Sequence, residues 1–437
     1  MRNRSWPTRL NIGFMLFAGS FMIYMLRANF SIILLAMTQQ YHWTSYEQNV
    51  LLSAYFCGYV GPNLIAGVIA ERFGGRIVIF LVFLASSVIT ALVPSLTSDN
   101  FHYLFLSRLV LGFCGGFFFC TCHNLISLWA PPAEKGIFMS SLLGSKLGTA
   151  LTWPLMGIII SVLDWRWTFY ITAILTFMFA IVWLRIVADS PEKHPNITQT
   201  EQQMIEKSLE LIITKKKDFP PISKMFKSRP FYALIFLHFS DVWGVFFLLT
   251  SAPMFMNQVL KYDLKHSGIV SSFPYIARLV FGFIFGFYGD HLMQRGVKAT
   301  KIRKLFCIFS HIIPGILLFG FCYVEDSPKT CILLITLSLG FNGAATMTSS
   351  QNPQDLAPNF AASVFGIVNF FATTSGFLSP LVVSYFTREK STMSEWRYIF
   401  ALDGTLYIVS GICFMLFGSA KVQRWNRKDS HKDLLKI

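Results

Sequence analysis

Charged residues are scarce in this sequence. Lysine, arginine, aspartate and glutamate make up 14% of its 437 residues, whereas hydrophobic residues make up 54%. Water-soluble domains contain roughly 25% charged residues, because a folded surface needs them to stay solvated. This shortage excludes a soluble globular protein, and a mean hydropathy of +0.52 indicates that much of the surface faces lipid.

Motifs of enzymes and metal proteins are also missing. No nucleophile–base pair, phosphate-binding loop or metal-ligand cluster occurs at a useful spacing, so we expect neither enzymatic activity nor a bound cofactor. The eight cysteines stand singly in or beside apolar runs, and we interpret most of them as small packing residues. Cys322 and Cys331 flank one short loop, which leaves a disulfide between them as an alternative.

Acidic residues are fewer than basic ones, 22 against 37, which gives a net charge of +15. The lysines and arginines are scattered in short blocks between apolar runs and form no continuous basic face. This pattern is typical of the cytoplasmic loops of a membrane protein and argues against a nucleic-acid partner. The basic N-terminus precedes an apolar run without a small-residue cleavage site, so we expect a first transmembrane helix and not a cleaved signal.

Twelve apolar runs are long enough to cross a membrane. They lie near residues 10–37, 48–70, 77–95, 102–128, 137–163, 167–187, 231–259, 266–288, 303–324, 330–351, 360–386 and 396–417. We predict an all-α polytopic membrane protein with two six-helix bundles, residues 1–187 and 230–420. The polar linker 188–229, with one amphipathic helix around 200–213, and a tail, 421–437, complete the chain.

The distribution of positive charge predicts the orientation. With the N-terminus taken as cytoplasmic, cytoplasmic segments hold 25 of the 37 lysines and arginines and the opposite segments hold seven. By the positive-inside rule, both termini are therefore cytoplasmic. The remaining five cations fall inside the helices: Arg27, Arg108, Lys146, Arg185 and Arg278.

The two halves repeat each other in sequence. Glu71, which follows the second span, has a counterpart in Asp290 after the eighth span, 219 residues later, and both are followed by basic residues. We predict that these loops form a cytoplasmic gate whose charge contacts hold one conformation and break in another. The alternative is that they are ordinary solvated loop charges. The predicted gating residues are Glu71, Arg72, Arg76, Asp290 and Arg295.

Ionisable residues at membrane depth are costly and usually line a substrate path or pair with one another. Here they are mostly cationic, so we expect an electropositive cavity that binds a small anion. Arg27 is the main candidate, because a guanidinium holds a carboxylate or phosphate with two hydrogen bonds. The alternative is a permanent structural ion pair. The predicted substrate-binding residues are Arg27, Tyr24, Asn29, Ser31 and Asn369.

The other intramembrane charges have less specific signals. His123 lies about four helical turns after Arg108 and is a candidate proton site, although a lone buried histidine is often only a satisfied core group. Asp241 either neutralises a cation or is the protonatable coupling acid. We expect a structural or conformational role for Arg108 and assign no specific role to Lys146 or Arg278. The polar residues of the tenth span either bind ligand or hold helices together.

Six segments occur in the order LRANFS (26–31), WAPPAE (129–134), Asp290, IRK (302–304), DLAP (355–358) and EWRYIF (395–400). Together they resemble the anion:cation symporter family of the major facilitator superfamily. The resemblance implies alternating-access transport of an organic or inorganic anion, driven by a proton gradient, a sodium gradient or the membrane potential. It also implies that Arg27 binds substrate and that His123 takes part in proton coupling.

The chain departs from this family at three places. It lacks the acid often found in the glycine-rich part of the fourth span, and the histidine of the tenth-span motif is missing. Asp241 stands where vesicular glutamate transporters have an arginine. These departures motivate one alternative, a membrane sensor or scaffold that keeps the fold without transporting. We expect a monomer in the plasma membrane or in an endolysosomal or vesicular membrane.

Overall fold

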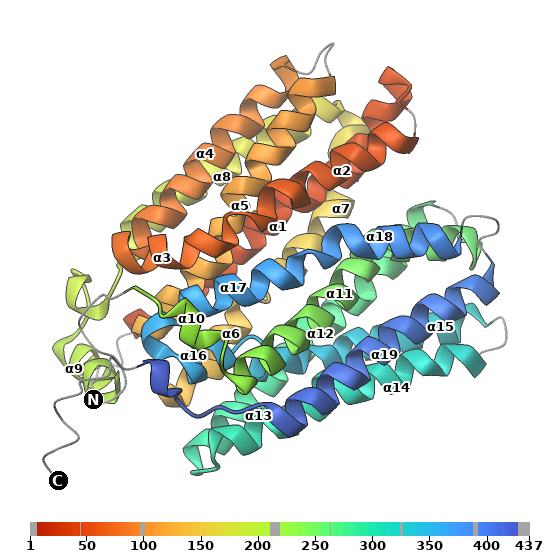
Figure 1. Cartoon of the computed structure of the whole chain (residues 1–437). Helices are drawn as coiled ribbons and strands as arrows, with labels where there is room; N and C mark the ends of the chain where they lie inside the picture. The colour runs from red at the N-terminus through yellow and green to blue at the C-terminus, as the bar shows by residue number, and fades with distance from the viewer. Residues whose placement is uncertain are drawn as a thin grey trace, which may run out of the picture.

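The computed structural model describes residues 7–43, 45–96, 101–209, 219–262, 264–323, 327–387 and 392–426. Within these ranges the chain is helical and contains no β-strand, which confirms the all-α prediction. The helices form two bundles, and Figure 1 shows the N-terminal bundle above the C-terminal one. Eleven helical segments are long and apolar enough to cross a membrane, and the bent pair α2 and α3 makes a twelfth span.

The N-terminal bundle contains the first six spans. Two of them are interrupted: α2 and α3 meet at 47°, and α6 and α7 are separated by a short turn. The helices of this bundle are α1 (Thr8–Tyr41), α2 (Ser45–Val60), α3 (Asn63–Phe73), α4 (Gly75–Leu96), α5 (Phe101–Trp129), α6 (Lys135–Ser141), α7 (Gly144–Val162) and α8 (Trp165–Ile186).

The C-terminal bundle contains the other six spans, and three of these are interrupted by short 3-10 or π-helical turns or by a turn without regular helix. Its helices are α11 (Arg229–Gln258), α12 (Leu264–Gln294), α13 (Ala299–Cys307), α14 (Ile313–Phe319), α15 (Pro328–Asn342), α16 (Asn352–Leu356), α17 (Ala361–Thr373), α18 (Ser375–Phe386) and α19 (Met393–Phe417). The π-helical turn Ile308–Ile312 joins α13 to α14.

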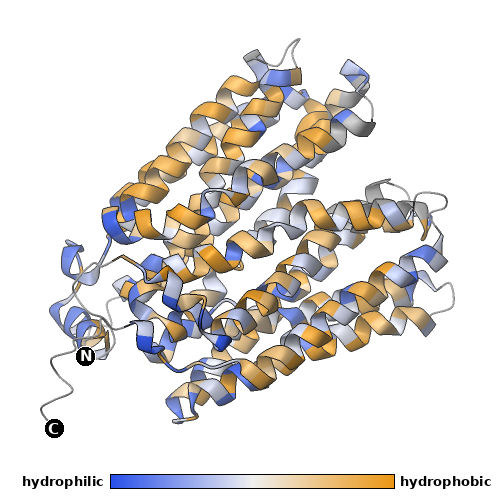
Figure 2. Ribbon diagram, in the orientation of Figure 1, coloured by the Kyte–Doolittle hydropathy of each residue, from blue (hydrophilic) through white to orange (hydrophobic). Residues whose placement is uncertain are grey.

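Apolar residues make up most of the length of the helices, as the ribbon colours in Figure 2 show. Large hydrophobic side chains stand exposed in mid-helix, among them Leu81 (53% exposed), Ile158 (61%) and Leu381 (64%). Exposed apolar surface on this scale is incompatible with water but suits the hydrocarbon core of a bilayer. The chain is therefore a multi-pass membrane protein.

Two short helices lie in the segment between the bundles, α9 (Gln199–Leu209) and α10 (Ile222–Met225). We call the side of the molecule on which they lie the linker side. α9 coincides with most of the predicted amphipathic helix, and residues 210–218 lie outside the described residues. Its Ile205 and Leu209 pack into the core of the N-terminal bundle, while Glu201 accepts hydrogen bonds from the backbone N–H groups of Thr8 and Arg9.

All eight cysteines are free. Cys322 is exposed and Cys331 is buried in the core of the C-terminal bundle, so the alternative of a disulfide between them is wrong.

Candidate functional site

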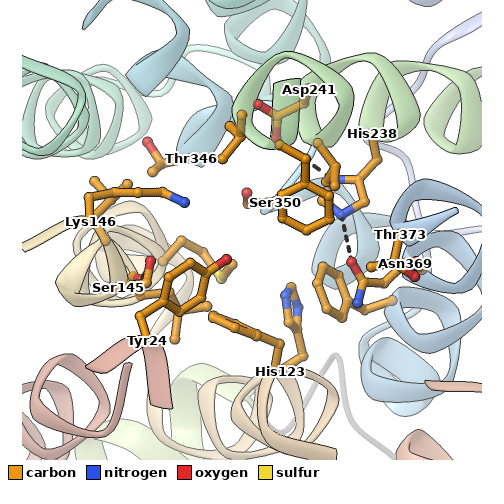
Figure 3. Close-up of a pocket in the computed structure, with 18 of the residues that line it drawn as sticks. Tyr24, His123, Ser145, Lys146, His238, Asp241, Thr346, Ser350, Asn369 and Thr373 are labelled. Atoms are coloured by element: carbon orange, nitrogen blue, oxygen red, sulfur yellow. Dashed lines mark hydrogen bonds and ion pairs between the residues drawn. The ribbon is translucent and has the colours of Figure 1, made fainter. Parts of the chain in front are cut away.

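A cavity lies between the two bundles, and both contribute to its walls (Figure 3). Helices α1, α5 and α7 supply one wall, and α11, α12 and α17 supply the other. Residues far apart in the sequence meet here, including six that the sequence singled out: Tyr24, His123, Lys146, Asp241, Arg278 and Asn369. Because the two walls belong to different bundles, a movement of one bundle against the other would open or close this space.

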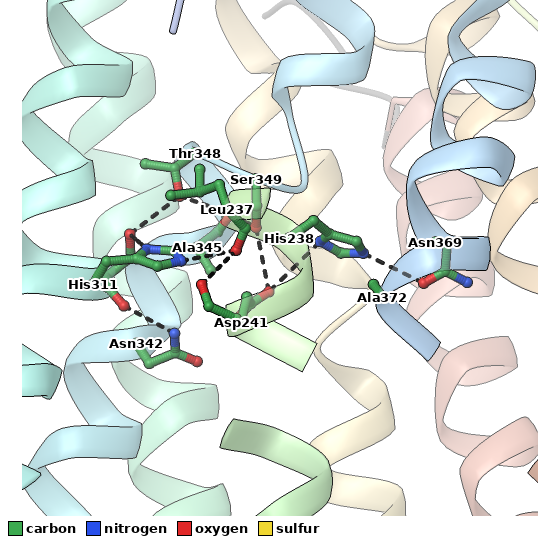
Figure 4. Close-up of polar contacts among 12 residues, drawn as sticks. Leu237, His238, Asp241, His311, Asn342, Ala345, Thr348, Ser349, Asn369 and Ala372 are labelled. Atoms are coloured by element: carbon green, nitrogen blue, oxygen red, sulfur yellow. Dashed lines mark hydrogen bonds and ion pairs between the residues drawn. The ribbon is translucent and has the colours of Figure 1, made fainter. Parts of the chain in front are cut away.

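Asp241 on α11 is held by a buried ion pair. One Arg278 nitrogen lies 2.8 Å from Asp241 Oδ1, and Ser349 Oγ donates a hydrogen bond of 3.2 Å to Oδ2. His238, one turn earlier on α11, places Nδ1 3.8 Å from the same Oδ2 (Figure 4). This geometry favours the first of the two predicted roles for Asp241, the neutralisation of a cation.

His238 continues a polar chain from Asp241 to the other bundle. Its Nε2 lies 3.3 Å from Asn369 Oδ1, and Asn369 Nδ2 donates a hydrogen bond of 2.9 Å to Asn63 Oδ1 on α3. The chain therefore crosses the interface between the bundles. His238 was not among the residues predicted from the sequence, although its spacing of three residues from Asp241 places both on one face of a helix.

His123 is fully buried and faces the cavity (Figure 3). Its ring stacks on Phe365 of the other bundle, with centroids 3.8 Å apart, and neither ring nitrogen has a hydrogen-bond partner in the described part of the chain. Its backbone carbonyl accepts a hydrogen bond of 2.7 Å from Gln354 Nε2. His123 is thus not the satisfied core histidine of the alternative interpretation, since its nitrogens remain available.

Lys146 on α7 extends its amine into the cavity (Figure 3). The side chain is buried, and Nζ lies 5.0 Å from the centre of the Tyr24 ring.

The polar side chains of the tenth span were predicted either to bind ligand or to hold helices together, and the structure shows both arrangements. Thr346 and Ser350 line the cavity, whereas Asn342 donates a hydrogen bond of 2.9 Å to the Ser310 carbonyl and holds two helical segments together.

Arg27 lies behind the cavity wall in a box of aromatic rings. Its guanidinium carbon is 4.3 Å from the ring centre of Phe56, 4.5 Å from that of Phe246 and 5.3 Å from that of Tyr24. These distances suit cation–π interactions.

Two nitrogens of the Arg27 guanidinium, Nε and one terminal nitrogen, have no hydrogen-bond partner among the described residues. A structural ion pair for Arg27 is not present in the described part of the molecule.

Arg108 also packs on aromatic rings, with its guanidinium carbon 4.1 Å from the centre of the Phe30 ring and 5.1 Å from that of the Tyr55 ring.

Asn29 and Ser31, which were predicted to bind substrate, do not reach the cavity. Asn29 Nδ2 donates a hydrogen bond of 3.4 Å to Thr172 on α8, and Ser31 Oγ accepts one of 3.2 Å from Trp153 on α7. The structure therefore separates these two residues and Arg108 from Lys146, Asp241 and Arg278.

The two predicted gate acids make matching contacts across the interface. Glu71, at the end of α3, accepts hydrogen bonds of 3.0 and 2.8 Å from the backbone and hydroxyl of Ser363 at the start of α17. Asp290, near the end of α12, accepts bonds of 2.8 and 2.7 Å from the backbone N–H groups of Gly136 and Ile137 at the start of α6. Each carboxylate thus caps a helix of the opposite bundle, where the partial positive charge of the helix favours it.

The predicted basic partners do not take part in these contacts. Arg76 donates to the Leu184 carbonyl within its own bundle, at 3.1 and 2.5 Å. Arg72 stacks on Phe219 of the linker segment, 4.2 Å from the ring centre. Arg295 is exposed. Within the described part of the chain, the contacts of Glu71 and Asp290 across the interface are therefore with helix starts.

Two bundles of six spans with a shared central cavity are the architecture of one large transporter class. The family model of the Major Facilitator Superfamily matches residues 16–380. The chain belongs to the Major Facilitator Superfamily. This membership makes it a transporter and not an enzyme, as the sequence predicted.

Relatives within this superfamily are similar over nearly the whole chain. Sialin of Ovis aries is 29% identical over 453 residues, which cover 96% of this chain and 91% of sialin. Vesicular glutamate transporter 2 of Homo sapiens is 28% identical over 392 residues, covering 88% of this chain and 67% of that protein. These matches confirm the resemblance to the anion:cation symporter family.

The solved structure of the proton:xylose symporter XylE bound to 6-bromo-6-deoxy-D-glucose has the same fold. It aligns with a TM-score of 0.71 at 13% identity and covers 95% of this chain and 97% of XylE. Two bundles of six spans, predicted from the apolar runs, are therefore the fold of this Major Facilitator Superfamily member.

Proposed function

We propose that this protein is a secondary active transporter that moves a small organic or inorganic anion across a membrane. The observation that carries the proposal is the charge of the cavity. Lys146 and Arg278 line it and Arg27 lies directly behind its wall, whereas Asp241 is the one acidic side chain among the described lining residues. Sialin and the vesicular glutamate transporters, by their names, add support for an anionic substrate.

Transport proceeds by alternating access of the cavity to the two sides of the membrane. Glu71 and Asp290 hold the bundles together on the linker side, so the structure corresponds to a state closed on that side. The positive-inside distribution supports assigning the linker side, with both termini, to the cytoplasm. The name of the vesicular relatives supports a vesicular or endolysosomal membrane, with the plasma membrane as the other candidate.

Arg27 is the main anion ligand and His123 the candidate proton site in this proposal. Arg27 has unpartnered nitrogens that an oxyanion would satisfy, and His123 has two unpartnered ring nitrogens beside the cavity. The driving force is a proton gradient, a sodium gradient or the membrane potential. Uptake measured with each gradient imposed separately distinguishes them.

Arg27→Ala tests the proposal. In proteoliposomes containing purified protein, we expect the variant to lose uptake of labelled anions from a panel of phosphate, sialate, glutamate and urate, because the anion loses its bidentate partner. Arg166→Ala is the matched control, since Arg166 is far from the cavity lining and its described contacts, an ion pair with Asp164 and a stacking contact with the Trp165 ring, are with neighbours in sequence. Normal uptake kinetics in a well-inserted Arg27→Ala protein would contradict the role of Arg27. No flux of any panel anion in the wild type would favour the sensor or scaffold alternative.

A further inference from the structure

Lys146 places a buried amine in the cavity without an ion-pair partner among the described residues. Its side chain is 7% exposed, and in the described residues its Nζ has no hydrogen bond or ion pair. Nζ lies over the face of the Tyr24 ring, 5.0 Å from its centre. Figure 3 shows the amine directed into the open part of the cavity, toward Ser350.

An ammonium group at membrane depth without a partner is strongly unfavourable, because it has left water without regaining its hydrogen bonds. Asp241 makes no direct contact with the Lys146 amine in the described residues, and its two oxygens are already bound by Arg278 and Ser349. The described lining of the cavity offers no other carboxylate. A negatively charged group on a ligand would therefore supply the partner that the Lys146 amine lacks.

Arg27 and Lys146 both lie close to the ring of Tyr24. Its ring lies 5.0 Å from Lys146 Nζ and 5.3 Å from the guanidinium carbon of Arg27. Phe246, which belongs to the other bundle, covers Arg27 with its ring centre at 4.5 Å. A movement between the bundles that displaces Phe246 would bring Arg27 and Lys146 into one continuous site.

The charges around this site do not balance. With the Lys146 amine protonated, Lys146, Arg278 and Arg27 carry three positive charges against the single negative charge of Asp241. A ligand with two negative charges would match this excess of two. A monovalent anion would leave one buried cation uncompensated, at a cost in binding free energy.

We propose that Lys146 is a second anion-binding residue and that the protein prefers substrates with two negatively charged groups, one held by Lys146 and the other by Arg27. This inference rests on the proposed function, because it specifies the anion that the transporter takes. Ser350 and the Tyr24 hydroxyl, both at the cavity, supply hydrogen bonds to the same ligand.

The test compares a dicarboxylate, succinate, with a monocarboxylate, gluconate, in proteoliposomes. The wild type should take up succinate at least tenfold more efficiently, and Lys146→Gln should reduce that preference about tenfold or more, which is the effect of losing one charge-assisted hydrogen bond. Arg185→Gln, which removes an exposed positive charge from α8, should leave the preference unchanged. A wild type that prefers gluconate, or a preference retained in Lys146→Gln, would overturn the role of Lys146.

Thermal unfolding of the purified proteins supplies a second readout. Without ligand, Lys146→Met should be at least as stable as the wild type, because it removes an uncompensated buried charge. Succinate should raise the Tm of the wild type but not that of Lys146→Met. A ligand-free Lys146→Met protein with a much lower Tm would show a structural role instead. Anion uptake without any dianion preference refutes this inference alone, whereas no flux of these two anions or of the earlier panel refutes the proposed function as well.

Discussion

Removing either member of the buried Asp241–Arg278 ion pair leaves the other charge without its counterion. Such losses cost about 3–5 kcal/mol when both groups are buried. We therefore expect Asp241→Asn and Arg278→Met each to lower the Tm of the purified protein clearly. The double variant should recover much of the loss, because removing both charges together removes the desolvation cost as well.

A double-mutant cycle of unfolding measurements checks this prediction. Ser349→Ala is a useful companion, because it removes a neutral hydrogen bond of 3.2 Å to the same carboxylate and keeps both charges. It should cost no more than about 1–2 kcal/mol. If the two single effects simply added in the double variant, the pair would not be the stabilising unit that the 2.8 Å contact indicates.

Residue-level predictions depended on which face of each helix a side chain occupies. Intramembrane charge was a sufficient signal for Lys146, Asp241 and Arg278, because charged groups in a bilayer must turn inward. The proximity of Asn29 to Arg27 in the sequence was not enough to place Asn29 at the cavity, because Asn29 lies about 200° around the helix from Arg27 and faces α8. The pairing of Asp241 with Arg278 was not predictable, since it depends on how α11 packs against α12.

The carboxylate caps on α6 and α17 couple helix ends to the state of the whole molecule. Each cap is supplied by the opposite bundle, so it exists only while the bundles are closed on the linker side. A helix cap contributes about 1 kcal/mol. Glu71→Ala combined with Asp290→Ala should therefore shift the population away from the closed state by roughly tenfold or more.

Cys120 reports this shift, because it is buried between α5 and α17, near Asn63. Its alkylation by N-ethylmaleimide, followed by peptide mass spectrometry, should be faster in the double variant than in the wild type. Asp164→Ala is the matched control, because Asp164 caps α8 within its own bundle through a 2.7 Å bond to Trp165 N–H. Equal acceleration by the control would mean that loss of a cap loosens the protein generally and that the caps are not a gate.

At the level of elements, the sequence predicted all twelve spans because apolar length is a strong signal in membrane proteins. It did not predict their interruptions. The break between α2 and α3 lies at Gly61-Pro62, which prevents regular helical hydrogen bonding. The π-helical turn Ile308–Ile312 lies just before Pro314, which has no N–H to bond the Ser310 carbonyl, and that carbonyl accepts a hydrogen bond from Asn342 instead. The sequence repeat identified the gate acids Glu71 and Asp290. Their partners, the starts of α17 and α6, could not be predicted, because they depend on how the two bundles contact each other.

The two bundles approach each other most closely where glycines replace side chains. A Cβ added to Gly67 on α3 would lie 2.5 Å from the backbone of Ser363 on α17, and one added to Gly286 on α12 would overlap Ser140 on α6. The two glycines are thus equivalent positions in the repeated halves, each beside a gate acid. The closed state of the whole molecule requires both close contacts.

Valine at either glycine should act as a wedge between the bundles. The substitution suits a helix better than glycine does, so we expect normal insertion, but the bundles can no longer close on the linker side. Gly67→Val and Gly286→Val should therefore abolish uptake and speed the alkylation of Cys120. Gly157→Val is the control, because a Cβ there meets nothing within 4 Å. Since a carrier must close on each side in turn, a wedge variant with normal uptake would show that close contact at this interface is not required for transport.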